Sequence, residues 1–174
     1  MTVYVADTGV FVRCGGREND KSHRLRRALR GANAELVVPW RVAAELGAHP
    51  ESEAYPSVDG TFSTGVEEGW VVVADELPYG DPLVSTVMDQ TRRFIATETG
   101  RNEDVVEKAD TALVGLAAHV LESGGATKVV VLTTDKPAGR GAERILANHG
   151  LGDRIEFRYA SEEFLQTVTV SDFS

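Results

Sequence analysis

Four acidic residues occupy positions where a carboxylate could take part in chemistry. Asp7 and Asp135 each follow a short apolar run typical of a buried strand, and ligands of open parallel α/β sheets bind beyond the carboxyl ends of strands. Glu45 lies on a mostly apolar helix predicted after another strand. Asp110 lies only about 40° around a predicted helix from Val106, on the flank of an apolar stripe. A carboxylate beside a core usually needs a partner or a metal ion, because burying it alone is costly.

Simpler explanations also exist for these acids. An acid that follows a strand is often a helix cap or a turn residue. Glu45 could belong to a solvated helix face, and Glu103 and Glu107 are favourable acids for the early turns of a helix. Residue type alone therefore leaves both interpretations open.

The surrounding pattern alternates strands and helices. Strands are predicted at 3–6, 36–38, 70–74, 128–132 and 155–159, and helices at 22–30, 40–46, 82–99, 103–122, 138–148 and 161–165. A loop is predicted directly after 7–9, and 48–66 reads as a loop with some possible helix. Because the strands are short continuous apolar runs, we expect an α/β domain over 1–174 with a parallel sheet covered on both faces.

Composition narrows the class of protein. The chain has 174 residues, with 18 Lys plus Arg, 27 Asp plus Glu and a net charge of -9. A single cysteine, Cys14, excludes an internal disulfide framework and a cysteine-based zinc cluster. With no long apolar run and no signal-peptide pattern, we predict no membrane span and a cytoplasmic location. The acidic total argues against charge-driven nucleic-acid binding, although residues 1–50 hold eight basic residues against five acids.

Four segments together resemble one known family. They are VYVADTG at 3–9, VVPWRVAAEL at 37–46, KADTALVGLA at 108–117 and VVLTTD at 130–135. Their order and their placement on strands and helices are similar to PIN-domain nucleases, which include VapC-like toxins and archaeal RNA-processing proteins. The resemblance runs nearly end to end and implies a three-layer α/β/α fold with a central parallel sheet of about five strands.

The resemblance also implies a catalytic metal site. Asp7, Glu45, Asp110 and Asp135 would converge, and four carboxylates would repel one another without a divalent cation. Carboxylate ligands with no His or Cys suit Mg²⁺ or Mn²⁺. Asp7 and Asp110 are the strongest candidate ligands; Asp135 could bind a second ion or hold a water, and Glu45 could be a ligand or help to deprotonate the nucleophile. Thr133 could orient a carboxylate through a hydrogen bond.

The implied substrate is RNA, hydrolysed at a phosphodiester bond. Carboxylates bind the metal, so basic side chains must hold the phosphate backbone. The candidates follow the first and fourth motifs and are Arg13, Arg17, Arg24, Arg26, Arg27, Arg30, Arg140 and Arg144. By the same resemblance, a protein antitoxin and a homodimer are possible partners, and the toxin and RNA-processing roles both stay open.

Other classes fit less well. Asp7-Thr8-Gly9 matches the aspartic-protease triplet, but those enzymes need two such triplets and this chain has one. A dehalogenase-type phosphatase needs a second Asp where Gly9 stands. With no Walker loop and no Rossmann glycine pattern, we expect no nucleotide cofactor. One alternative stays open, namely a PIN fold that binds or scaffolds RNA with little catalysis.

Overall fold

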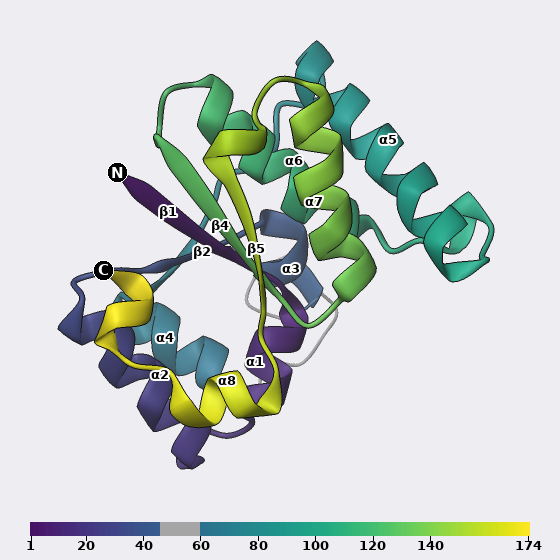
Figure 1. The fold of residues 1–174 in the computed structure, drawn as a ribbon. Helices are drawn as coiled ribbons and strands as arrows, with labels where there is room; N and C mark the ends of the chain where they lie inside the picture. The colour runs from purple at the N-terminus through teal and green to yellow at the C-terminus, as the bar shows by residue number, and fades with distance from the viewer. Residues whose placement is uncertain (46–59) are drawn as a thin grey trace.

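A five-stranded parallel sheet forms the centre of the computed structural model, which describes residues 1–45 and 60–174 except for the side chain of Glu45 (Figure 1). The strands lie in the order β3-β2-β1-β4-β5, with bounds β1 Thr2–Ala6, β2 Leu36–Val38, β3 Val71–Val73, β4 Lys128–Thr133 and β5 Ile155–Tyr159. Every neighbouring pair is parallel. Because β1 lies between β2 and β4, the chain reverses its direction of growth across the sheet there. Such a switch point is where parallel α/β sheets bind ligands.

Helices cover both faces of the sheet, as predicted (Figure 1). One face carries α5, α6 and α7, and the other carries α1, α2, α4 and α8. Their bounds, with that of α3, are α1 Thr8–Cys14, α2 Asp20–Gly31, α3 Trp40–Glu45, α4 Thr61–Glu68, α5 Pro82–Thr99, α6 Lys108–Glu122, α7 Lys136–Asn148 and α8 Glu162–Thr167. Short 3-10 turns lie at Glu103–Val105, Gly152–Arg154 and Val170–Phe173. The expected three-layer α/β/α architecture is confirmed.

The central strands are apolar on both sides because each side meets a different helical layer. Tyr4 and Ala6 of β1 pack into the core beneath α1, α2 and α8. Val5, which points the opposite way, packs beneath α5, α6 and α7. Successive side chains of a strand point to opposite faces, so a strand buried on both faces reads as an unbroken apolar run. This is why these strands were recognisable from the sequence.

The segment after β1 is a helix, so the prediction of a loop there is wrong. Asp7 caps α1, and its side chain accepts a hydrogen bond from the Val10 amide at 3.2 Å. Val10, Phe11 and Cys14 are all buried. The segment is short and holds β-branched residues, so its helix-forming propensity is weak. Capping and burial on one face stabilise it instead.

The predicted helix at 103–122 is divided in two. A 3-10 turn ends before Val106, which is extended, and α6 begins at Lys108 after Glu107. The break lets Val106 pack against Ile95 and Ala138 between two other helices. It also places Asp110 in the first turn of α6 instead of the middle of a longer helix.

Several other boundaries move. Residues 61–66 of the segment predicted as a loop with some possible helix belong to α4, which continues to Glu68. Residues 48–59 of that segment lie outside the described residues, as does residue 46 at the predicted end of α3. The helix predicted at 22–30 begins at Asp20, and the one predicted at 138–148 begins at Lys136. These starts match their capping residues, Asn19 and Asp135, whose side chains accept hydrogen bonds from the first turn.

Candidate active site

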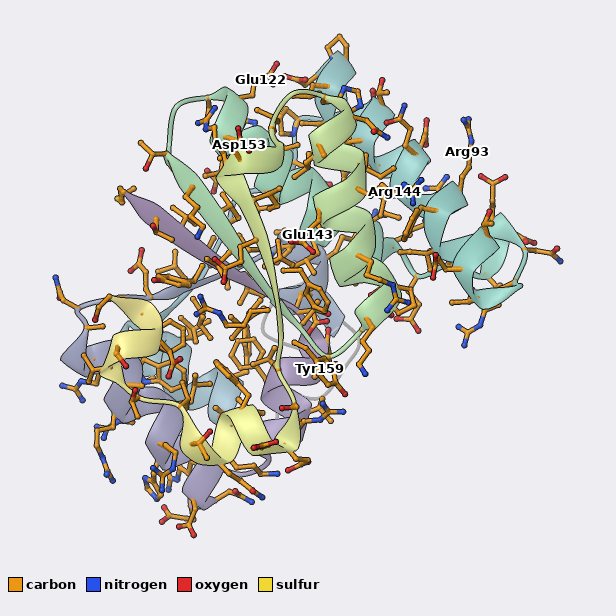
Figure 2. The ribbon with its side chains drawn as sticks, in the orientation of Figure 1. Arg93, Glu122, Glu143, Arg144, Asp153 and Tyr159 are labelled. Carbon is orange, nitrogen blue, oxygen red and sulfur yellow. The ribbon has the colours of Figure 1, made fainter. Side chains whose placement is uncertain are left out.

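A cleft of about 590 Å³ opens at the carboxyl edge of the sheet, beyond β1 and β4. The starts of α1, α6 and α7, the end of α5 and Tyr159 at the end of β5 line it; Figure 2 shows Tyr159 at this end of the strand. Asp7, Asp110 and Asp135 all contribute to the lining. The structure thus brings together three acids that are far apart in the sequence.

Asp7 is the most enclosed of the three carboxylates, with only 6% of its surface exposed. Burial raises the pKa of this carboxyl group from 3.8 to about 6, because ionisation in a poorly solvated site is costly. Hydrogen bonds from Thr133 and from the Val10 amide oppose the rise, and the nearby charge of Asp135 adds to it. A positive charge in the cleft would favour the ionised form of Asp7.

Thr133 links the carboxylate of Asp7 to the backbone of Asp135. Its buried hydroxyl donates a hydrogen bond to Oδ2 of Asp7 and accepts one from the Asp135 amide at 2.9 Å. Oδ1 of Asp135 in turn accepts a hydrogen bond from the Ala138 amide at 3.0 Å and caps α7. The expected hydrogen bond from Thr133 to a carboxylate is therefore present, and it fixes Asp7 relative to the β4–α7 turn.

Close packing keeps this turn against α1. A Cβ atom added at Gly9 would lie 1.8 Å from Oγ1 of Thr134. A contact that short is a steric overlap, so the two elements can approach this closely only because residue 9 is glycine. Two of the acids, one before α1 and one before α7, are consequently held near each other.

Asp110 reaches the cleft from the opposite helical layer. It is half-buried in the first turn of α6, where the partial positive charge of the helix N-terminus favours a carboxylate. Glu45 is the last residue of α3, and its side chain lies outside the described part of the chain.

The donor chemistry of the cleft suits a hard divalent cation. The carboxylates offer oxygen atoms, as Mg²⁺ and Mn²⁺ prefer, and the raised pKa of Asp7 marks a carboxylate without a strong cationic partner. In the described residues, however, no three or more His, Cys, Asp or Glu side chains are grouped closely enough to enclose an ion. The ligand types therefore suit such an ion. Full coordination would require either a further ligand from outside the described residues or a closer approach of the three carboxylates.

Cationic and aromatic groups stand beside the acids, and the sequence reasoning missed most of them. Arg101 and Lys136 line the cleft with Tyr159. The Lys136 ammonium lies 4.7 Å from the centroid of the Tyr159 ring. The Arg13 guanidinium also contacts this ring, at 5.8 Å from its centroid. Lys136 directly follows Asp135, so its position was a usable signal. Arg101 reaches the cleft only through the packing of α5.

The arginine-rich segment contributes less to the cleft than predicted. Only Arg13 of that segment reaches the cleft wall, through Tyr159. Arg26 and Arg30 pair with Glu68 of α4, and α2 lies on the far helical layer (Figure 1). Arg140 pairs with Glu98 at 3.2 Å. Arg26 and Arg30 therefore pair with an acid and do not line the cleft, and the role of the α2 arginines in holding the RNA backbone stays a prediction.

Cys14 offers no nucleophile to the cleft. It is fully buried as a free thiol, and burial raises the pKa of the thiol to about 12. Because the thiolate is the reactive form, this residue is a packing residue of α1.

Comparison with known proteins agrees with the geometry. Residues 1–173 match the family model described as Halobacterial PIN domain. No curated protein and no solved structure matches the chain. Within the described part of the chain, no helix is long and apolar enough to cross a membrane. PIN domains are in general nucleases and typically use divalent metals, which accords with an acidic cleft at the switch point of the sheet. The match covers almost every residue, and the chain belongs to the Halobacterial PIN domain family.

Proposed function

We propose that the chain is a divalent-metal-dependent endoribonuclease, with residues 1–174 acting as one nuclease domain. The observation that carries this proposal is the meeting of three carboxylates in one cleft, where Asp7 is buried, hydrogen-bonded and raised in pKa. A buried carboxylate of this kind is costly to keep ionised. Membership of a nuclease family and the cations beside the cleft support the same reading.

Asp7 and Asp110 are the proposed principal ligands of Mg²⁺ or Mn²⁺, with Asp135 and Glu45 completing the set. A bound divalent cation would neutralise the carboxylates, acidify a water molecule and stabilise charge on the attacked phosphate. These are the requirements of phosphodiester hydrolysis, in which water attacks phosphorus and the ribose oxygen leaves.

The remaining roles fall to the chain's own side chains. Thr133 holds Asp7 in place through its hydroxyl hydrogen bond. Lys136 and Arg101 line the same cleft and would attract the negative phosphate. Glu45 or Asp135 would accept the proton released by the attacking water.

A second candidate function is an RNA-binding or scaffolding module with little catalysis. The observation that favours it is the lack, among the described residues, of three acidic, His or Cys side chains grouped closely enough to hold an ion. In that case the cleft would bind RNA through its cations, and divalent ions would not change the product.

The test is RNA cleavage by metal-stripped protein before and after addition of Mn²⁺ or Mg²⁺. Wild type should cleave internal bonds of single-stranded RNA only after the metal is added. Asp7→Asn and Asp110→Asn should lose nearly all of this activity, because each keeps the side-chain shape and removes a charged ligand. Mn²⁺ should also raise the melting temperature of wild type, since an ion that binds only the folded state stabilises it.

The matched control is Asp153→Asn. Asp153 is exposed and lies at the opposite end of β5 from Tyr159 (Figure 2). Asp153→Asn makes the same chemical change at a site remote from the cleft, so this variant should cleave RNA as wild type does. Equal cleavage by wild type, Asp7→Asn and Asp110→Asn would overturn the proposal, and metal-independent RNA binding without cleavage would establish the second candidate.

A further inference from the structure

A second pocket lies at the same edge of the sheet and has the opposite charge. It has a volume of about 280 Å³, and three cations line it: Arg41 of α3, Arg92 of α5 and Lys108 of α6. We propose that this cationic pocket binds a backbone phosphate of the RNA strand whose scissile phosphate lies in the acidic cleft. The proposal rests on the proposed function for the identity of the ligand.

The charge of the pocket is incompletely balanced within the described residues. Among the described residues, Asp89 is the only acid that lines it, and it forms an ion pair with Arg92 at 3.6 Å. Arg41 packs over the ring of Trp40 at 5.7 Å. Lys108 is exposed and has no ion pair in the described part of the chain. Three cations against one acid stand out on a protein whose net charge is -9.

This cluster also has a chemistry suited to phosphate. Arg and Lys are the side chains that bind phosphate oxygens, with Arg supplying paired N–H groups. Tyr79 also lines the pocket and carries a phenolic hydroxyl, whereas the hydroxyls of Ser85 and Thr111 already donate to backbone carbonyls of their own helices. The volume is sufficient for a phosphate with several water molecules.

The first turn of α6 separates the cationic pocket from the acidic cleft. Glu107 and Asp110 line the cleft, whereas Lys108 and Thr111 line the pocket. Lys108 and Asp110 are two residues apart, so their Cα atoms are about 5 Å apart by helix geometry. A strand that crosses this turn would place one phosphate in the cleft and a neighbouring phosphate at the pocket.

The order of the strands gives this path a direction. The pocket stands beyond β2, whose following helix supplies Arg41, and the cleft stands beyond β1 and β4. Lys136 and Tyr159 lie on the other side of the cleft, toward β5. Cations thus flank the acids on both sides along the carboxyl edge, as a single RNA strand laid across this edge would require.

The test measures RNA binding without cleavage. Metal-stripped protein in EDTA is titrated into a short fluorescent single-stranded RNA, and anisotropy is followed at several KCl concentrations. Arg92→Ala and Lys108→Ala should each weaken binding roughly tenfold at low salt, because each removes a charge-assisted hydrogen bond to phosphate. Each should also reduce the slope of log affinity against log salt by about 0.7.

Arg93→Ala is the matched control. Arg93 is the next residue on α5, carries the same charge and pairs with Glu103 instead, and Figure 2 shows it projecting outward from this helix. Its loss should change neither affinity nor salt slope. Arg92→Lys, which keeps the charge, should recover part of the binding, and melting temperatures should show that every variant folds.

Further experiments distinguish an RNA phosphate from free phosphate as the ligand, and they distinguish failure of the pocket proposal from failure of the nuclease proposal. RNA with neutral methylphosphonate linkages at the docked position should bind wild type and Arg92→Ala alike. Competition by inorganic phosphate, with equal RNA affinity in all variants, would identify a free-phosphate site and overturn the inference. Normal cleavage with unchanged RNA affinity in Arg92→Ala and Lys108→Ala would also overturn it while leaving the nuclease proposal intact. Weakened binding by these variants without any cleavage would support the pocket and refute the nuclease.

Discussion

The first turn of α6 divides two surfaces that differ in charge and in rigidity. On one side, Asp110 joins two other carboxylates in a cleft whose innermost acid is buried and held by two hydrogen bonds. On the other side, Lys108 joins two arginines in a pocket, and these three cationic side chains are exposed or half-buried. Buried, hydrogen-bonded groups have their positions set by the fold, whereas exposed cations can adjust to a ligand. The contrast implies that the cleft governs the chemical step and the pocket governs binding.

The largest expected effect is a split in kinetic parameters between the two surfaces. Asp110→Asn should lower kcat about a thousandfold, because loss of a metal ligand removes several kcal/mol of transition-state stabilisation. Arg92→Ala should act mainly on KM, raising it roughly tenfold. Steady-state cleavage of one RNA by both variants measures this, and a fall in kcat of equal size in both would erase the distinction between the surfaces.

The next effect is on the stability of the metal-free protein. The pKa of Asp7 is about 6 in the folded state against an ordinary value of 3.8, so between these two pH values the folded state binds more protons than the unfolded state. Its contribution to the free energy of unfolding therefore falls as pH rises, by up to about 3 kcal/mol between roughly pH 4 and pH 7. Asp7→Asn should remove this fall and be more stable than wild type near neutral pH.

Denaturant unfolding in EDTA across that pH range makes the comparison. The difference between the two proteins isolates Asp7 from the other carboxylates, which titrate in both. Parallel pH profiles of the free energy of unfolding for wild type and Asp7→Asn would show that burial does not raise the pKa of Asp7. For exposed Lys108→Ala, the pH profile should remain that of wild type.

A smaller effect is expected at Thr133, which supports the acids without lining the cleft. Thr133→Val keeps the shape and removes the hydroxyl, so Mn²⁺ affinity should fall about 10- to 100-fold, as for other groups that orient ligands. Thr91→Val is the control, because Thr91 is also buried and its hydroxyl has no hydrogen-bond partner within the described residues. Calorimetric Mn²⁺ titration should show unchanged affinity for Thr91→Val, and equal affinities in both variants would remove the role assigned to Thr133.

The smallest effect is expected on α2. Arg26 pairs with Glu68, and both side chains are partly exposed at 39% and 29%. An exposed ion pair contributes up to about 1 kcal/mol, so Arg26→Ala should change the free energy of unfolding by no more than that. RNA affinity should be unaffected, in contrast to Arg92→Ala. A tenfold loss of RNA binding by Arg26→Ala would move the nucleic-acid surface to the opposite helical layer.

The local sequence was sufficient to predict the layers of the fold and the positions of Asp7 and Asp135, two of the acids that line the cleft. The strands of 3–6 and 128–132 are continuous apolar runs, and Asp7 and Asp135 follow them directly, so strand ends located both acids. The helix α1 escaped prediction because its stability comes from capping and burial more than from propensity. The break at Val106 escaped because it depends on contacts with Ile95 and Ala138 from other helices.

Charge counting was less informative about partners. It assigned the arginines of α2 to RNA because they follow the first motif along the chain, yet an acid on α4 pairs with two of them. The cationic pocket was invisible because Arg41, Arg92 and Lys108 share no pattern along the chain. Arg92 and Arg93 are adjacent, and only the packing of α5 against α6 gives them different surroundings.

The most direct measurement is the position of Mn²⁺ in crystals soaked at a concentration that supports RNA cleavage. The account predicts an anomalous peak in the cleft, bonded to carboxylate oxygens of Asp7 and Asp110 and lost in Asp7→Asn crystals. An anomalous peak that avoids both residues, or none at a concentration that supports cleavage, would contradict it.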